Sequence, residues 1–180
     1  MKKLIFIALL SFELAPAMAQ HNGHNCGNCP HHKQHGASCQ QQQKQQPATI
    51  NGLAAEVVKA FPEARSVKKE DKWSVVYNAK LQVLGYAVYS KPASDGIKGY
   101  NGETPLMIAL DKNQKVLCVV LLPNNETPGY LQRVLDAGLL SSWNGMKTGK
   151  AAKKKVDTVA GATFSSKSII ETVQAALKKL

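Results

Sequence analysis

The chain has 180 residues, 44% of them hydrophobic, and its 23 basic and 12 acidic residues give a formal charge of +11. This length leaves room for one globular domain of ordinary size. A basic balance is typical of nucleic-acid-binding proteins, but the export signal described next argues against that class. The lysine run at residues 153–155 is instead expected to be a solvated face, or a docking surface for an anionic lipid or an acidic redox partner.

The first nineteen residues predict a secretory signal peptide. Two lysines precede an apolar stretch from residue 4 to residue 12, and the small-x-small motif Ala17-Met18-Ala19 marks a cleavage site. The apolar stretch is too short to cross a bilayer as a helix. We therefore expect a protein that is exported to the periplasm or the cell surface and is soluble there.

Residues 20–47 are rich in His, Cys and Gln and predict a disordered tether. All five histidines of the chain and three of its four cysteines lie in this segment. Cys26 and Cys29, with His31 and His32, offer ligands suited to zinc or copper. A disulfide of Cys26 with Cys29 or Cys39 is an equally open alternative in an oxidising compartment. An exported metal-binding protein that acts through this tether is thus one hypothesis for the function.

Residues 48–180 carry the patterns of a folded domain with both strands and helices. An apolar helical face from Leu53 to Phe61 predicts the first helix, and residues 73–77 and 81–89 predict strands. The apolar runs 106–110 and 116–122 bracket a polar turn and predict a hairpin. Further helices are predicted over 130–140 and at the C-terminus, where an apolar stripe starts at residue 169. We expect an α+β fold with a small antiparallel or mixed sheet and flanking helices.

The domain lacks the residues of several enzyme classes. It contains no histidine, which excludes Ser-His-Asp and Cys-His hydrolases and a histidine-ligated catalytic metal there. Cys118 lies in an apolar strand and is expected to be a buried structural thiol. Neither a phosphate-loop motif nor a G-x-G-x-x-G motif is present. These absences direct attention to the short glycine-containing loops.

The loop at residues 157–166 has the features of a phosphate site. Thr163 lies just ahead of the last helix and follows a Gly-Ala step that lets the backbone approach a ligand closely. Free backbone N–H groups and the helix dipole at such a position favour a phosphate group. Ser168 and Glu171 match a capping box, so the sequence does not decide where the first turn of this helix lies.

Three loops together resemble one known family. Residues 157–165 resemble the signature D-x-x-[ST]-G-A-[TS]-x-[ST], with Ala160 in place of Ser or Thr. The turn at residues 99–102 resembles the G-Y-x-G motif of the same family, and residues 126–129 resemble its E-T-P-G loop. This family is the FMN-binding domain of periplasmic subunits of sodium-pumping NADH:quinone oxidoreductase and of Rnf-type complexes. Its G-A-[TS] residue carries FMN through a phosphoester bond, and here the matching residue is Thr163.

The resemblance implies a flavoprotein that acts as an extracytoplasmic electron carrier rather than as a substrate-converting enzyme. FMN would be attached by an exported flavin transferase that uses FAD, with Asp157 serving the attachment. Its partners would be redox proteins or a membrane electron-transfer complex, and we expect a stand-alone monomer that binds no nucleic acid. The residues expected around the phosphate are Gly161, Ala162, Ser165 and Ser166, and those expected around the flavin ring are Tyr100, Glu126, Thr127 and Trp143.

Overall fold

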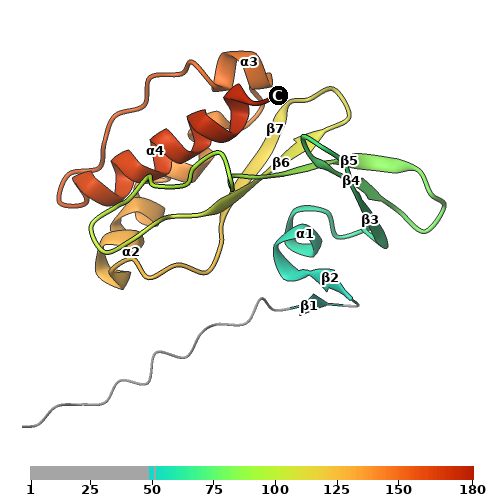
Figure 1. The fold of residues 1–180 in the computed structure, drawn as a ribbon, viewed down its shortest axis with the longest axis horizontal. Coiled ribbons are helices and arrows are strands. Elements are labelled where there is room, and N and C mark those ends of the chain that lie inside the picture. The colour runs from blue at the N-terminus through green and yellow to red at the C-terminus, as the bar shows by residue number, and fades with distance from the viewer. Residues whose placement is uncertain (1–48, 51) are drawn as a thin grey trace, which may run out of the picture. The chain divides into compact units, whose positions relative to one another are not determined.

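The computed structural model describes residues 49–50 and 52–180 (Figure 1). The predictions of a signal peptide over 1–19, a tether over 20–47 and metal ligands in that tether lie outside these residues. No helix in the described part of the chain is long and apolar enough to cross a membrane. In chain order the elements are β1 (Thr49–Ile50), β2 (Leu53–Ala54), α1 (Ala55–Ala60), β3 (Ser66–Lys69), β4 (Ser74–Tyr77), β5 (Val83–Tyr89), β6 (Leu106–Asp111), β7 (Val116–Leu121), α2 (Pro128–Asp136), the 3-10 helix η1 (Leu139–Trp143), α3 (Thr148–Ala151) and α4 (Thr163–Lys178).

The centre of the fold is a five-stranded antiparallel sheet with its strands in sequence order, from β3 to β7. The hairpin predicted over 106–122 is confirmed as β6 and β7. Strands β1 and β2 form a separate two-stranded sheet. This arrangement of an antiparallel sheet with helices confirms the α+β class.

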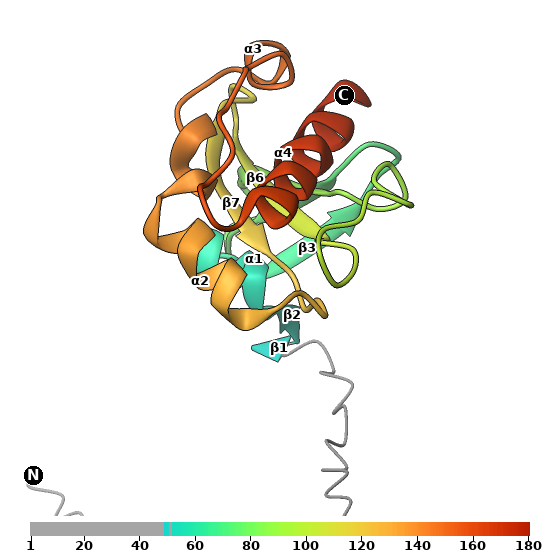
Figure 2. The same cartoon turned by 90° about the vertical axis from the view of Figure 1, so that its left-hand side faces the viewer.

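Helices cover both faces of the sheet (Figures 1 and 2). Strand β6 shows how the sequence produces this layering, because its side chains alternate between the two faces. Leu106, Ile108 and Leu110 pack in the core cluster that includes α4, whereas Met107 and Ala109 pack in the cluster that includes α1. All five side chains have 0% exposure, so β6 is buried on both faces and anchors the two cores.

The position of the first turn of the last helix was left undecided by the capping-box match in the sequence. Helix α4 begins at Thr163, so Ser168 and Glu171 do not form a capping box at its N-terminus. Ser168 lies inside the helix, is buried, and has its hydroxyl oxygen 2.7 Å from Oγ1 of Thr104. A capping residue must precede the first turn, whereas this hydroxyl joins the helix to the segment before β6.

Other element boundaries differ from the predictions for local backbone reasons. Strand β5 begins at Val83, because Leu81 is in a turn and has a φ of 58°. The predicted helix over 130–140 is split after Asp136, since Gly138 takes a left-handed φ of 67° before η1. Strand β3 was not predicted; most of its residues are exposed, so it has little of the apolar alternation that marks a strand in a sequence.

Candidate functional site

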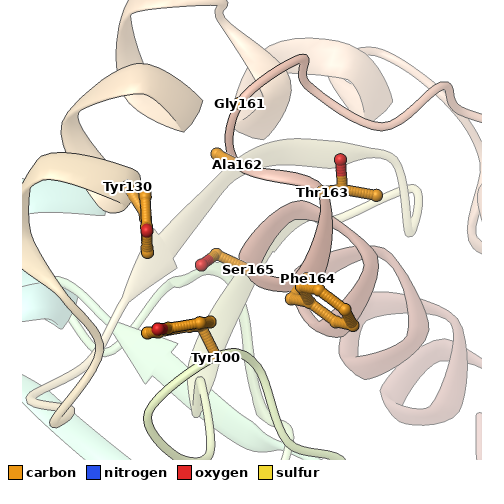
Figure 3. Close-up of a pocket in the computed structure, with 7 residues that line it drawn as sticks. All are labelled: Tyr100, Tyr130, Gly161, Ala162, Thr163, Phe164 and Ser165. Carbon is orange, nitrogen blue, oxygen red and sulfur yellow. The ribbon is translucent and has the colours of Figure 1, made fainter.

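A pocket of about 230 Å³ lies at the N-terminal end of α4 (Figure 3). Its lining comes from three segments that are far apart in the sequence: the 99–102 turn, the start of α2, and the loop that enters α4. These segments contain the three motifs singled out above, so folding brings the motifs together. The volume is below the range of about 300–1,000 Å³ usual for pockets that enclose a whole small molecule, so a larger ligand would extend beyond the rim. The lining residues are Tyr100, Tyr130, Gly161, Ala162, Thr163, Phe164 and Ser165.

Three aromatic side chains surround the pocket. The ring of Tyr100 packs edge-on against that of Tyr130, with centroids 5.1 Å apart and an interplanar angle of 82°. Tyr100 is 62% exposed and Phe164 is 68% exposed. Large aromatic faces left open to solvent beside a pocket suit stacking against a planar aromatic ligand.

The helix end of the pocket is suited to an anion. Ala162 precedes the first turn of α4, and no side chain among the described residues caps that turn. The N–H groups of an uncapped first turn, together with the helix dipole, attract a phosphate. This end of the pocket is therefore the favourable place for the charged part of a ligand.

Ser165 supplies a hydroxyl that has no partner within the described residues. The side chain is 1% exposed, and its Oγ atom is buried without a hydrogen bond. Figure 3 shows this hydroxyl directed toward the space between Tyr100 and Tyr130. A buried polar group without a partner costs about 1–3 kcal/mol, so a bound ligand that hydrogen-bonds Ser165 would recover this cost.

Ser166 has a different role from the phosphate contact that was expected. It is fully buried, and its Oγ accepts a hydrogen bond from the Val159 N–H at 3.0 Å and donates to the Ala162 carbonyl at 2.8 Å. These bonds join the turn at residues 159–162 to the first turn of α4. Ser166 therefore holds the shape of the loop and does not line the pocket.

Arg133 on α2 lies beside the pocket-lining Gly161 and was not predicted from the sequence. Gly161 has a φ of +73°, and a Cβ atom at this position would lie 2.2 Å from Nη1 of Arg133. The guanidinium group thus packs directly over the loop at Gly161, and a side chain at this position would have to displace it. Arg133 is exposed and forms no ion pair with the described residues. A planar guanidinium in this place suits a phosphate.

Glu126 clamps the turn that carries Tyr100. The carboxylate is 5% exposed; Oε2 accepts the Tyr100 N–H at 2.9 Å, and Oε1 accepts the Asn101 N–H at 2.8 Å and the Thr127 N–H at 3.2 Å. A Cβ at Gly99 would lie 1.9 Å from Oε2, which explains the glycine. The polar contact with a flavin ring expected for Glu126 is therefore corrected: its oxygens are occupied by backbone, and it positions Tyr100.

Three other expected residues do not line the pocket. Trp143 is fully buried in the core cluster with α4, so the wall role expected for it is corrected: the indole is covered by the core. Thr127 is half-buried and precedes α2, and Asp157 is exposed in the loop before α4. Tyr130 and Phe164, which do line the pocket, were missed because an isolated aromatic residue in a sequence is as often part of a core.

The described part of the chain contains no group of three or more His, Cys, Asp or Glu side chains that could hold a metal ion. Cys118 is half-buried beside the apolar cluster that includes α1, and burial raises the pKa of its thiol. A raised pKa lowers the thiolate fraction and therefore the reactivity. The expectation of a structural thiol agrees with this position, although the burial is only partial.

The fold and the pocket define a small α+β domain suited to a ligand with a planar aromatic part and a phosphate. Residues 99–178 match the FMN-binding domain family, and this stretch includes every pocket-lining residue. The chain is also 27% identical over 128 residues to a subunit of the Na(+)-translocating ferredoxin:NAD(+) oxidoreductase complex of Acetobacterium woodii. That alignment covers 70% of this chain and 58% of the relative, so the chain spans little more than half of the relative's length.

Proposed function

We propose that the pocket at the N-terminus of α4 holds FMN as a phosphoester on Thr163, and that the protein carries electrons outside the cytoplasm. The observation that carries the proposal is the convergence of the three motif loops on one pocket, with Thr163 as the first residue of α4. When bound, FMN supplies one- and two-electron redox chemistry. The chain's own residues supply attachment, orientation and charge.

Solvent exposure supports Thr163 as the attachment residue. Three hydroxyls lie close together at this end of the helix, and a transferase must reach the one that it modifies. Thr163 is exposed, whereas Ser165 is 1% exposed and Ser166 is 0% exposed. Asp157 is also exposed, in agreement with a role in recognition by the flavin transferase.

The residues around Thr163 would divide between the two parts of FMN. The first-turn N–H groups of α4, the Ser165 hydroxyl and the Arg133 guanidinium would hold the phosphate and the ribityl chain. Tyr100, Tyr130 and Phe164 would stack against or border the isoalloxazine ring. Because the pocket is small and open, part of the ring would stay exposed to a redox partner.

We propose the redox partners of this chain by analogy with the relative. That protein is a subunit of an ion-translocating oxidoreductase complex, and we propose that this chain exchanges electrons with redox proteins or with a membrane complex of similar chemistry. Maturation would need a flavin transferase. The periplasm or the cell surface remains the proposed location, which fractionation of cells that express the full chain would test.

Covalent attachment is tested with the full chain expressed in a host that makes the transferase. We expect the mass of one FMN less one water on the chain and a fluorescent band after denaturing electrophoresis. Thr163→Ala should remove the band, and Thr163→Ser should retain it. Ser165→Ala is the matched control: it removes a neighbouring hydroxyl and should retain a covalent band. Peptide mapping that placed flavin on Ser165 or Ser166, or flavin lost in denaturant, would overturn the attachment site but not FMN binding.

The proposed phosphate contact of Arg133 has a natural control, because the chain has only two arginines. Arg133→Gln should lower the extent of flavin attachment at a fixed time about ten-fold, the value of one charge-assisted hydrogen bond. Arg65→Gln changes the same charge near β3 and should have no effect. Equal attachment in the two variants would remove Arg133 from the site.

The second hypothesis, a zinc or copper site at Cys26, Cys29, His31 and His32, lies outside the described residues. It stays a prediction and does not compete with FMN for the same part of the chain.

A further inference from the structure

A positively charged surface lies at the opposite end of α4 from the pocket. The β6–β7 turn and the segment around α3 meet there, since Lys115 and Lys147 form an isolated backbone bridge and the Thr148 N–H donates to the Gln114 carbonyl at 3.2 Å. Figures 1 and 2 both place α3 beside this turn. Six exposed lysines from the two segments make up what we call the lysine face: Lys112, Lys115, Lys147, Lys150, Lys153 and Lys155.

The positive charge of the lysine face is not neutralised locally. None of its lysines forms an ion pair with a described residue. The only acidic residue in segments 111–115 and 147–155 is Asp111. Its carboxylate accepts the backbone N–H groups of Asn113 and Lys115, each at 2.8 Å, so it shapes the turn. The six ammonium groups therefore present a field that extends into solvent.

We propose that the lysine face docks the domain on an anionic lipid bilayer. Protein interfaces are enriched in Tyr, Trp and Arg and depleted in Lys, and these two segments contain no aromatic residue and no arginine. Lysine is a flexible, strongly hydrated point charge. This composition suits the diffuse charge of lipid headgroups better than the fixed geometry of a protein partner.

Docking through this face would orient the flavin pocket. Helix α4 has 16 residues, which corresponds to a length of about 24 Å. Its N-terminal end forms the pocket, and its C-terminal end lies near α3 in both views. The amide of Gln174 also donates to the Lys154 carbonyl at 3.1 Å. A bilayer bound at the lysine face would leave the pocket on the far side, open to a redox partner; the docking itself does not depend on the flavin.

The first test measures binding of the full chain to vesicles by sedimentation. We expect binding to phosphatidylcholine vesicles that contain phosphatidylglycerol, no binding to pure phosphatidylcholine, and release in about 1 M salt, where the screening length falls to ~3 Å. Each lysine near such a surface contributes roughly a five-fold factor in affinity. The triple variant Lys150→Gln, Lys153→Gln, Lys155→Gln should therefore bind about 100-fold more weakly.

The matched control removes three exposed lysines elsewhere, with Lys59→Gln, Lys69→Gln and Lys80→Gln. It makes the same change in net charge and should bind vesicles nearly as well as the unaltered chain. Equal loss in both triple variants would show that net charge alone acts and would overturn the proposal. Failure of the unaltered chain to bind anionic vesicles would overturn it too, even if the face then captured an acidic protein.

Chemical acetylation of the lysines, compared between vesicle-bound and free protein, gives a second measurement. The lysine face should be protected from reagent on anionic vesicles, whereas Lys59, Lys69 and Lys80 should stay reactive. Protection of the control lysines instead would place the bilayer on another surface. The band of covalent flavin should be the same in both triple variants, which keeps this test separate from that of the FMN site.

Discussion

Replacing Glu126 by Gln tests whether this buried carboxylate holds the turn that carries Tyr100. The carboxylate accepts three backbone N–H groups, at 2.9, 2.8 and 3.2 Å. A glutamine keeps one acceptor oxygen and turns an NH2 group toward at least one of these donors. Hydrogen bonds to a charged group contribute about 1.5–3 kcal/mol each, and an unpaired buried donor costs ~1–3 kcal/mol. We therefore expect Glu126→Gln to lower the free energy of unfolding by about 2–4 kcal/mol.

Urea unfolding of the full chain measures this loss, with Glu171→Gln as the control. Glu171 is an exposed helix residue whose carboxylate lies 3.9 Å from Lys167 Nζ, and surface pairs of this kind contribute less than about 1 kcal/mol. Glu126→Gln should also lower the yield of covalent flavin, because Tyr100 would no longer be fixed beside the pocket. If the two variants unfolded at the same urea concentration, the clamp would not be stabilising and the argument for Glu126 would be refuted.

Four further predictions follow from the structure. Gly161→Ala and Gly145→Ala both place a side chain at a φ above +70°, so each should lower the free energy of unfolding by about 1–2 kcal/mol. Only Gly161→Ala, which displaces the Arg133 guanidinium, should also lower flavin attachment; equal attachment in the two variants would contradict the role proposed for Arg133. Burial and a nearby carboxylate raise the pKa of Tyr89 from 10.0 to about 12, so its contribution to stability is present below pH 10 and lost between about pH 10 and 12. The thermal unfolding temperature should therefore fall less steeply across that pH range in Tyr89→Phe than in the unaltered chain, and identical slopes would refute the shift. Because burial raises the thiol pKa of Cys118, alkylation at pH 8 followed by peptide mapping should label it more slowly than an unfolded control, whereas equal rates would show an accessible thiol. Deleting residues 21–46 should leave the flavin content unchanged by absorbance, and loss of flavin would show that the tether takes part in loading.

Much of the fold was predictable because the buried strands carry a strong local signal. The run from Leu106 to Leu110 and the run that follows it are apolar on both faces and bracket a polar turn, so the hairpin of β6 and β7 followed directly. Strand β3 escaped prediction because it is exposed, and its pairing with β4 supplies what its own sequence lacks. The start of α4 was uncertain because Ser168 mimics a cap in sequence, and only its contact with Thr104 shows that it is an interior residue.

The candidate site, like the fold, was only partly predictable from the sequence. The resemblance of three short loops to a known family pointed to Thr163, to the turn at Tyr100 and to the loop at Glu126, because such motifs are local and can be found without knowledge of the fold. Tertiary structure decided which of these residues line the pocket, because burial and approach between distant segments are not encoded in any one stretch. It brought Arg133 over Gly161, buried Trp143 in the core and turned the Glu126 carboxylate to backbone N–H groups. A residue's type limits the chemistry that it can perform, and its packing decides whether a ligand can reach it.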